Sequence, residues 1–326
     1  MLIWIQKWEE FDRMDRGILF DMYPELLNHE RRRPDIPEID PLLRDVWKHD
    51  SVQNIHDRWN ATVVCEALKE TKDFFGQEDQ IWMILGSSAQ PLKTAPKAYP
   101  LRPDWAAIFK TKGWKPGQDA AKSMMPGDTK VSTGWKSEEI VPGSTMKATT
   151  RREEWFKPLA QIFTYCRTLR VRYGYLITDQ ELVAVRIGYR TKVPKKKGKR
   201  TVDAEMDHMD KDGWLEYARV TWTQEESSSS LTVNLALWWL HLLAANDNSI
   251  RWKYPPLKEE TLYGQGRSTV HEHEQSQNSD VTDAPLHSFN GSIANSRYDF
   301  RKRHRADEQQ GNKKKVRIGD PVDESD

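Results

Sequence analysis

Asp128 and Lys130 lie two residues apart and bring together a candidate metal ligand and a candidate catalytic base. A β-favouring valine follows them, and in a strand residues two apart project from the same face. The Asp128 carboxylate and the Lys130 ammonium would then lie side by side. A carboxylate binds a hard divalent cation, and an ammonium neutralises charge on a phosphoryl oxygen. The pair suggests metal-assisted hydrolysis, and its plain alternative is a solvated surface ion pair.

A second acidic residue, Asp104, strengthens this interpretation. The triplet alone is weak evidence, because an acid and a base two residues apart should occur roughly 7 times by chance in a chain of this composition. Asp104 follows a proline and opens the apolar stretch 103–109, which is typical of a strand. If this strand pairs antiparallel with 126–132, Asp104 lies opposite Asp128, with Lys130 on the same face. Two carboxylates suit Mg²⁺, which binds one or two of them together with water and phosphate oxygens.

The hydrophobic pattern predicts the helices and strands that would position these residues. Apolar residues recur at helical spacing, or form long apolar runs, over 57–75, 152–170 and 231–246. Shorter apolar or alternating runs predict strands over 81–85, 103–109, 126–132, 172–178, 181–187 and 214–222, with a hairpin turn at 179–180. The charged stretch 193–213 is interpreted as an exposed loop. Together these elements predict an α/β domain with a mixed central sheet flanked by helices.

Composition divides the chain into three parts. Residues 1–50 are interpreted as an N-terminal extension with short helices, 51–262 as the folded domain, and 263–326 as a polar tail that we expect to be disordered. Cys65 and Cys166 lack metal-type spacing, which favours reduced thiols in an intracellular protein. The most apolar run, near 231–246, is shorter than the roughly 20 residues that span a bilayer, so we expect no membrane segment. The start of the chain lacks the pattern of a signal peptide.

The charges are balanced overall but unevenly distributed. A formal net charge of +1 argues against a global basic field for non-specific nucleic-acid binding. Two basic clusters in 301–317 are separated by a polar spacer, in the manner of a bipartite nuclear localisation signal. This predicts a nuclear location, and a solvated charged tail is the alternative.

Two stretches resemble the motifs of the PD-(D/E)xK nuclease superfamily. RPDWAAIF looks like its PD strand and PGDTKVS like its (D/E)xK strand. The predicted order of helix, three strands, helix and strand over 57–178 is similar to that family's core. The phrases WNATVV and RYGYLITDQELVAVRI also resemble uncharacterised fungal proteins with nuclease-like domains. The resemblance implies a restriction-endonuclease-like αβββαβ core, here followed by extra C-terminal strands and a helix.

The resemblance also implies roles for individual residues. Asp104 and Asp128 would bind Mg²⁺, with Mn²⁺ as an alternative, and Thr129 would lend its main-chain carbonyl. Lys130 would orient or deprotonate the attacking water and stabilise charge on the phosphate. Gln161 is placed like the polar residue that often faces the site from the following helix, although a surface or structural amide is the alternative.

Many members of this family carry a glutamate on the first helix, and here the corresponding residue is ambiguous. Asn60, Glu66 and Glu70 are the candidates. Asn60 lies nearest the centre of the apolar face and Glu70 near its edge, which favours either of them over Glu66. The lack of a clear glutamate at this place is the main departure from the family's pattern, and it affects whether full activity is expected.

The function predicted from the sequence is metal-dependent hydrolysis of nucleic acid, with DNA favoured over RNA. A catalytically inactive nuclease-fold module that binds nucleic acid or a protein partner is the alternative. A purely structural interaction domain is a third interpretation. Strandedness, sequence preference and oligomeric state do not follow from the sequence.

Overall fold

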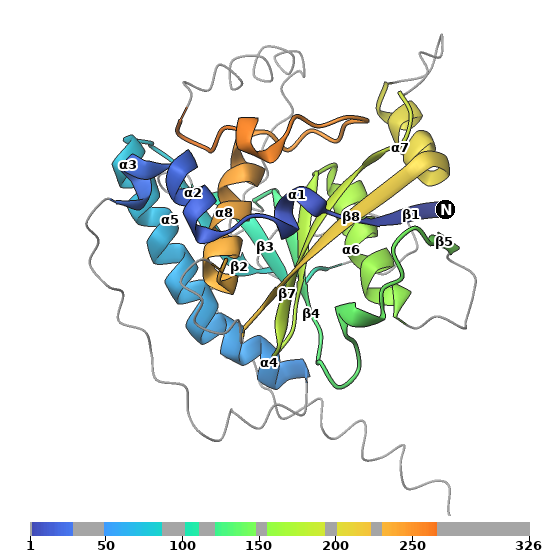
Figure 1. The fold of residues 1–326 in the computed structure, drawn as a ribbon, viewed down its shortest axis with the longest axis horizontal. Helices are drawn as coiled ribbons and strands as arrows, with labels where there is room; N and C mark the ends of the chain where they lie inside the picture. Colours follow the sequence, from blue (N-terminus) through green and yellow to red (C-terminus); the bar gives the residue numbers. More distant parts are fainter. Residues whose placement is uncertain are drawn as a thin grey trace, which may run out of the picture. The chain divides into compact units, whose positions relative to one another are not determined.

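The apolar runs of the sequence form strands of one mixed sheet, in the order β2-β3-β4-β6-β7-β8-β1-β5 (Figure 1). The computed structural model describes residues 2–28, 49–86, 102–110, 121–147, 155–192, 201–222 and 230–265. The strands are β1 (Leu2–Lys7), β2 (Gln80–Leu85), β3 (Trp105–Lys110), β4 (Met125–Thr129), β5 (Thr145–Lys147), β6 (Tyr173–Ile177), β7 (Glu181–Tyr189) and β8 (Gly213–Thr221). The pairs β4–β6 and β1–β8 are parallel, and the others are antiparallel.

Helices cover both faces of this sheet. They are α1 (Glu9–Asp12), α2 (Arg16–Met22), α3 (Pro24–Leu27), α4 (His49–Ile55), the π-helical turn η2 (His56–Asn60), α5 (Ala61–Phe75), α6 (Phe156–Leu169), α7 (Thr201–Asp212) and α8 (Val233–Asn246), with short 3₁₀ turns η4 (Ser137–Glu139) and η5 (Leu257–Glu259). On one face α5 and α8 enclose a core that includes Leu68, Tyr175 and Trp239. On the other face α6 packs Ile162 against a second core that contains Leu176.

The predicted α/β architecture, a mixed sheet flanked by helices, is confirmed. Each predicted strand and helix between 57 and 246 has a counterpart within a few residues of its predicted bounds. The prediction of a loop over 193–213 was wrong for its second half, where α7 forms. Met209 anchors α7 in the core, and Arg167 on α6 bonds to Asp210 at 2.6 Å. The charged residues around Met209 concealed this apolar anchor in the sequence.

The first residues of the chain contribute a strand that the sequence analysis did not predict. β1 lies between β8 and β5 and pairs parallel with β8. Its side chains Ile3 and Ile5 are buried in the core that α6 covers. Residues 2–28 therefore belong to the same sheet and core as the predicted domain. The predicted tail stays a prediction from residue 266 onward, because 266–326 lie outside the described residues.

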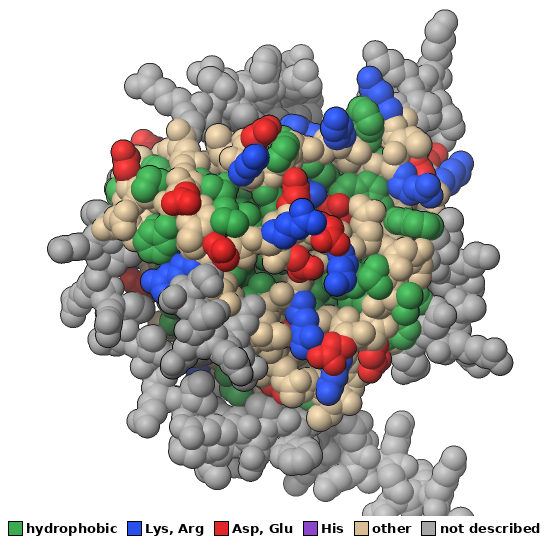
Figure 2. Space-filling view, in the orientation of Figure 1, with side chains coloured by type: hydrophobic (Ala, Val, Ile, Leu, Met, Phe, Trp, Pro, Cys, Tyr) green, Lys and Arg blue, Asp and Glu red, His purple; other side chains and the backbone are tan. Residues whose placement is uncertain are grey.

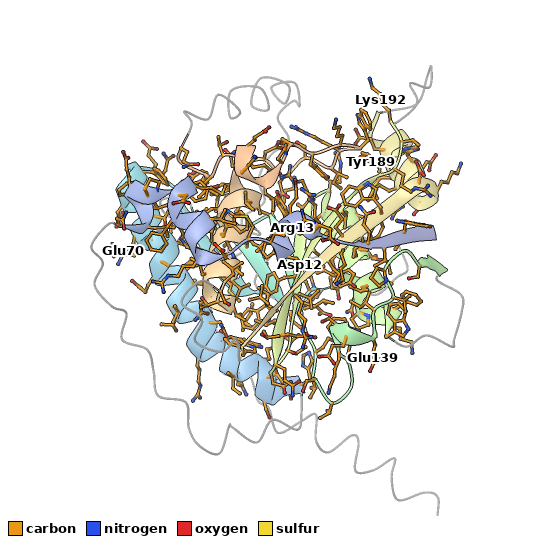
Figure 3. All side chains as sticks on the ribbon, viewed as in Figure 1. Asp12, Arg13, Glu70, Glu139, Tyr189 and Lys192 are labelled. Atoms are coloured by element: carbon orange, nitrogen blue, oxygen red, sulfur yellow. The ribbon has the colours of Figure 1, made fainter. Side chains whose placement is uncertain are left out.

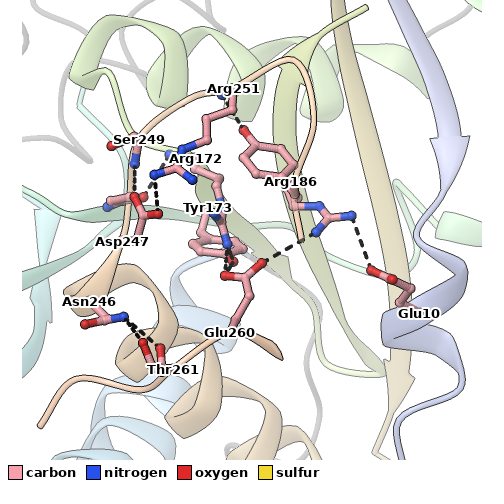
Figure 4. Close-up of polar contacts among 12 residues, drawn as sticks. Glu10, Arg172, Tyr173, Arg186, Asn246, Asp247, Ser249, Arg251, Glu260 and Thr261 are labelled. Carbon is pink, nitrogen blue, oxygen red and sulfur yellow. Dashed lines mark hydrogen bonds and ion pairs between the residues drawn. The ribbon is translucent and has the colours of Figure 1, made fainter. Parts of the chain in front are cut away.

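A buried cluster of charged side chains joins distant parts of the chain (Figure 4). Arg172, at the start of β6, is fully buried and contacts the Glu260 carboxylate. Arg186 on β7 bonds to Glu216 on β8 at 2.6 Å and lies 3.7 Å from Glu10 of α1. Removing one partner of a buried pair leaves an uncompensated charge, so the buried contact between Arg172 and Glu260 holds the segment around residue 260 against the sheet, whereas Glu10 is half exposed.

The face of the molecule that Figure 2 presents is mixed in charge. Acidic and basic side chains lie close together on it, in keeping with the formal net charge of +1. None of the helices in the described ranges is both long and apolar enough to cross a membrane. Any binding of an anionic polymer must therefore depend on local groups rather than on a field of one sign.

Candidate active site

The antiparallel ladder between β3 and β4 brings two acidic residues together. Trp105 pairs with Gly127, so the next position along places Asp104 opposite Asp128, in the register predicted from the sequence. The main-chain N–H of Thr129 donates to Asp104 Oδ2 at 2.8 Å. The two carboxylates therefore lie at one end of adjacent strands, held by main-chain geometry.

Lys130 completes a compact charged group. Its ammonium donates to Asp128 Oδ2. Its main-chain N–H donates to the Ile177 carbonyl at 2.9 Å, which extends the pairing of β4 with β6. Asp128 is only 2% exposed, whereas the Asp104 and Lys130 side chains are each 22% exposed. The pair is thus not a solvated surface ion pair, and the group reaches solvent through Asp104 and Lys130.

The environment separates the pKa values of the two carboxyl groups. Burial raises the pKa of Asp128, the neighbouring charge of Asp104 adds to this, and the result is about 7 despite the opposing effect of Lys130. Burial acts on Asp104 in the same direction, but hydrogen bonds from His49 and the Thr129 N–H outweigh it and hold the pKa of Asp104 below its ordinary value. Near neutral pH, Asp104 is ionised and Asp128 exchanges a proton.

His49 joins this group from a part of the chain for which no site residue was predicted. Its Nε2 lies 3.1 Å from Asp104 Oδ2, and this hydrogen bond raises the pKa of His49 although burial opposes it. The imidazole therefore orients the Asp104 carboxylate and favours its ionised form. No sequence signal pointed to His49, because it is an isolated histidine 55 residues away from Asp104.

The three candidates on the first helix make their contacts elsewhere. Asn60 is buried and bonds to His56 and Asn234, at 2.7 and 2.6 Å. Glu66 is half exposed and pairs with a neighbouring lysine of its own helix. Figure 3 shows Glu70 on the flank of α5 that faces away from the sheet. His49, rather than any of these three, contacts the carboxylate pair from the helical side.

Gln161 reaches the site indirectly, through a tyrosine. Its Nε2 donates to the Tyr165 hydroxyl at 2.7 Å, and that hydroxyl donates to the Arg102 carbonyl at 3.1 Å, two residues before Asp104. Burial and the negative charges of Asp128 and Asp104 raise the pKa of Tyr165 to about 12, so the phenol stays protonated beside the carboxylates. The sequence analysis named Gln161 but missed Tyr165, which lies one turn further on the same face of α6.

Gly127 allows β4 to approach the core closely. A Cβ at this position would lie 2.1 Å from the ring of Tyr175, which is itself 1% exposed and cannot move aside. The residue before Asp128 must therefore lack a side chain. This contact keeps Asp128 at its level in the sheet.

The oxygen atoms at the ends of β3 and β4 suit a hard divalent cation. Asp104 and Asp128 offer carboxylates and Thr129 offers a carbonyl, a donor set that fits Mg²⁺ or Mn²⁺. Burial, and after it the charge of Asp104, raises the pKa of Asp128, and the positive charge of a bound cation would favour its ionised form. Among the described residues, no three His, Cys, Asp or Glu side chains form a complete metal centre. A cation here would need water or substrate oxygens as further ligands.

Comparisons of the chain with protein-family models, with curated proteins and with solved structures find no match. The geometry of the described residues combines paired carboxylates, an ammonium, an imidazole and a phenol at one end of adjacent strands. Such a set can bind a divalent cation, hold an anionic substrate and control protons near neutral pH.

Proposed function

We propose that the chain is a metal-dependent nuclease that hydrolyses phosphodiester bonds of nucleic acid, with DNA favoured over RNA. The observation that supports it best is the β3–β4 register, which sets Asp104 against Asp128 while Lys130 bonds to Asp128. Apart from the short strand β5 between β4 and α6, the succession α5, β2, β3, β4, α6 and β6 is the one expected of a PD-(D/E)xK core, and we propose that class of fold for it.

Each residue of the site has a task in this proposal. Asp104, Asp128 and the Thr129 carbonyl would hold Mg²⁺ or Mn²⁺, which when bound supplies positive charge to the phosphate and lowers the pKa of water. Lys130 orients the attacking water and neutralises charge that develops on the phosphoryl oxygens. His49 keeps the Asp104 carboxylate ionised and correctly rotated.

The hydroxyl of Tyr165 has a positioning task. It donates to the main chain at Arg102 and so holds the segment that leads into Asp104, while Gln161 fixes the orientation of the phenol. Loss of Gln161 should therefore be milder than loss of Tyr165. Both residues act on the approach to the site rather than on the reacting atoms.

A nuclease-fold module that binds without cutting is the second candidate. A specific observation favours it: the buried carboxyl group of Asp128 is stabilised without any cation, either by binding a proton or by contacting Lys130. In that case the charged group would be a structural element, and the chain would bind nucleic acid or a protein partner through other surfaces.

Cleavage assays separate the two candidates. Labelled single- and double-stranded DNA and RNA are incubated with the protein in Mg²⁺, Mn²⁺ or EDTA, beside Asp128→Ala and Lys130→Ala variants. The nuclease proposal expects metal-dependent cleavage that both substitutions abolish. A folded wild-type protein that cuts none of these substrates with either metal would favour the binding module.

We also propose that the chain enters the nucleus, which would agree with a nucleic-acid substrate. The basis is the pair of basic clusters in 301–317, which lie outside the described residues. A fusion of the full chain to a fluorescent protein tests this. Alanine substitution of the basic residues in 301–317 should shift the fluorescence from the nucleus to the cytoplasm, and an unchanged distribution would contradict the proposal.

A further inference from the structure

The helical run that carries His49 is interrupted by a π turn. Figure 1 shows α4 and α5 continuing as one helical ribbon, and η2 lies between them. The N–H of Ala61 donates to the His56 carbonyl, five residues back, whereas an α-helix bonds four residues back. The turn therefore encloses one residue more than a regular turn. The hydroxyl of Thr62 donates to the Arg58 carbonyl at 2.8 Å, which satisfies an acceptor within the π turn.

The extra residue keeps the two halves of the run facing the same way. One row of buried residues recurs at every fourth position, at Val52, His56, Asn60, Val64 and Leu68. In an unbroken α-helix, at about 100° per residue, this row would drift by about 160° from first to last. Because the π turn absorbs one residue, the drift falls to about 60°. His49 lies almost one turn before Val52 and shares this face.

Buried polar side chains hold the π turn in place. His56 Nδ1 lies 2.7 Å from Asn60 Oδ1, and Asn60 Nδ2 donates to Asn234 Oδ1 on α8 at 2.6 Å. Since the Asn60 amide group donates to Asn234, its oxygen accepts from the His56 ring. The His56 ring also stacks on Trp222, at 5.8 Å between centroids. His56 and Asn60 are 1% and 0% exposed, so these bonds are shielded from water.

We propose that His56 and Asn60 are positioning residues, which hold a π turn that rotates α4 so that His49 reaches Asp104. This assigns a task to Asn60, the amide near the centre of the apolar face, which does not contact the carboxylate pair. Its effect on cleavage rests on the proposed nuclease function. The contact between His49 and Asp104 can be measured without that function.

The test changes the length of the run by one residue in either direction. Deleting Asp57, which is exposed, lets 49–75 form a regular α-helix with His49 still facing Asp104. Inserting one alanine between Asp57 and Arg58 turns α4 by about 100° and carries His49 away. Asp57→Ala is the matched control, because it keeps the chain length. Circular dichroism and urea unfolding establish that each variant folds.

The primary measurement is the coupling between His49 and Asp104 in urea unfolding. The coupling energy is obtained from a double-mutant cycle of His49→Ala, Asp104→Ala and the double variant. The cycle is repeated in each background, with EDTA present. We expect the wild-type coupling with Asp57→Ala and with the deletion, and its loss with the insertion. Coupling that survives the insertion, or that the deletion alone abolishes in a folded protein, would overturn the proposal.

A rescue experiment separates positioning from a merely structural role. Asn60→Ala removes the bond that holds the π turn, and Asn234→Ala removes its anchor without altering the run. Both should lose the coupling between His49 and Asp104. Deleting Asp57 in the Asn60→Ala background should restore it, because a regular helix no longer needs the anchor. If Asn60→Ala and Asn234→Ala keep the full coupling, or if the deletion restores nothing, the inference is wrong.

Cleavage gives a second readout that depends on the proposed function. The insertion variant should cut as slowly as His49→Ala, about 10- to 100-fold below wild type, and the deletion variant at the wild-type rate. If the wild-type protein cuts nothing while the coupling behaves as expected, the nuclease proposal fails and the positioning inference stands. If the wild type cuts but the coupling does not depend on chain length, the nuclease proposal stands and the positioning inference fails.

Discussion

Replacing Asp128 with asparagine should stabilise the folded protein while abolishing cleavage. The fold raises the pKa of Asp128 from 3.8 to about 7, mainly through burial and the charge of Asp104. The folded state thus binds this proton more tightly than the unfolded chain does. The resulting stability is present at low pH and is lost as the pH rises from about 4 to 7. At pH 8 the ionised carboxylate costs about 4 kcal/mol, because one pKa unit corresponds to about 1.36 kcal/mol.

Asparagine keeps the shape of the side chain and removes its charge. Asp128→Asn should therefore raise the free energy of unfolding by up to about 4 kcal/mol at pH 8 and by only about 1 kcal/mol at pH 4.5. Urea unfolding in EDTA at the two pH values measures both differences. Asp73→Asn, at an exposed position of α5, is the control and should change little at either pH.

Added Mg²⁺ provides an independent arm of this test. A cation that binds the folded site should raise the unfolding midpoint of the wild-type protein at pH 8, because binding to the native state alone adds stability. The same addition should leave Asp128→Asn nearly unchanged. An asparagine variant that is no more stable than wild type at pH 8 would refute the reasoning about the buried charge. A response to Mg²⁺ that is equal in both proteins would remove Asp128 from the metal site.

Three further predictions concern the surroundings of the site. His49→Ala should lower the cleavage rate about 10- to 100-fold at subsaturating metal, and an unchanged rate would exclude a role in orienting the carboxylate. Gly127→Ala should destabilise the fold by about 1–3 kcal/mol, because its Cβ would meet the Tyr175 ring at 2.1 Å. The control Gly134→Ala, whose Cβ meets only a carbonyl at 3.7 Å, should be nearly neutral in the same urea unfolding. Burial lowers the pKa of His241 to about 4, so stability that is full above pH 6.5 falls as the pH drops toward 4. His241→Leu should reduce that loss by up to about 3 kcal/mol in unfolding at pH 7 and pH 4, and an equal loss in both proteins would contradict the prediction.

The sequence predicted the part of the site that depends on local pairing. Asp104 and Asp128 come together because two strands that are neighbours in the chain pair antiparallel. Thr129 and Lys130 follow directly from the same strand. These are short-range consequences of hydrophobic pattern, so one sequence suffices to predict them.

The remaining parts depend on contacts between residues far apart in the chain. His49 meets Asp104 across 55 residues, and the position of its helix depends on a π turn that periodicity does not reveal. β1 was missed because its partner β8 is distant, as in the bond from Gln6 to Glu216 across 210 residues. Tyr165 looked like an ordinary core aromatic, since its importance lies in a hydroxyl bond to a main-chain carbonyl.

The pairing of β1 with β8 affects how the protein folds during synthesis. β1 leaves the ribosome long before β8, the strand with which its residues Ile3 to Lys7 pair and which is completed only at Thr221. Until then its main-chain donors and acceptors and the side chains Ile3 and Ile5 remain available to other partners, including the β1 strands of neighbouring nascent chains. Folding through such a late contact is slow, because the entropy of a long loop is lost before the stabilising contacts between β1 and β8 form. A chaperone that binds short apolar segments should therefore engage β1 until β8 has emerged from the ribosome.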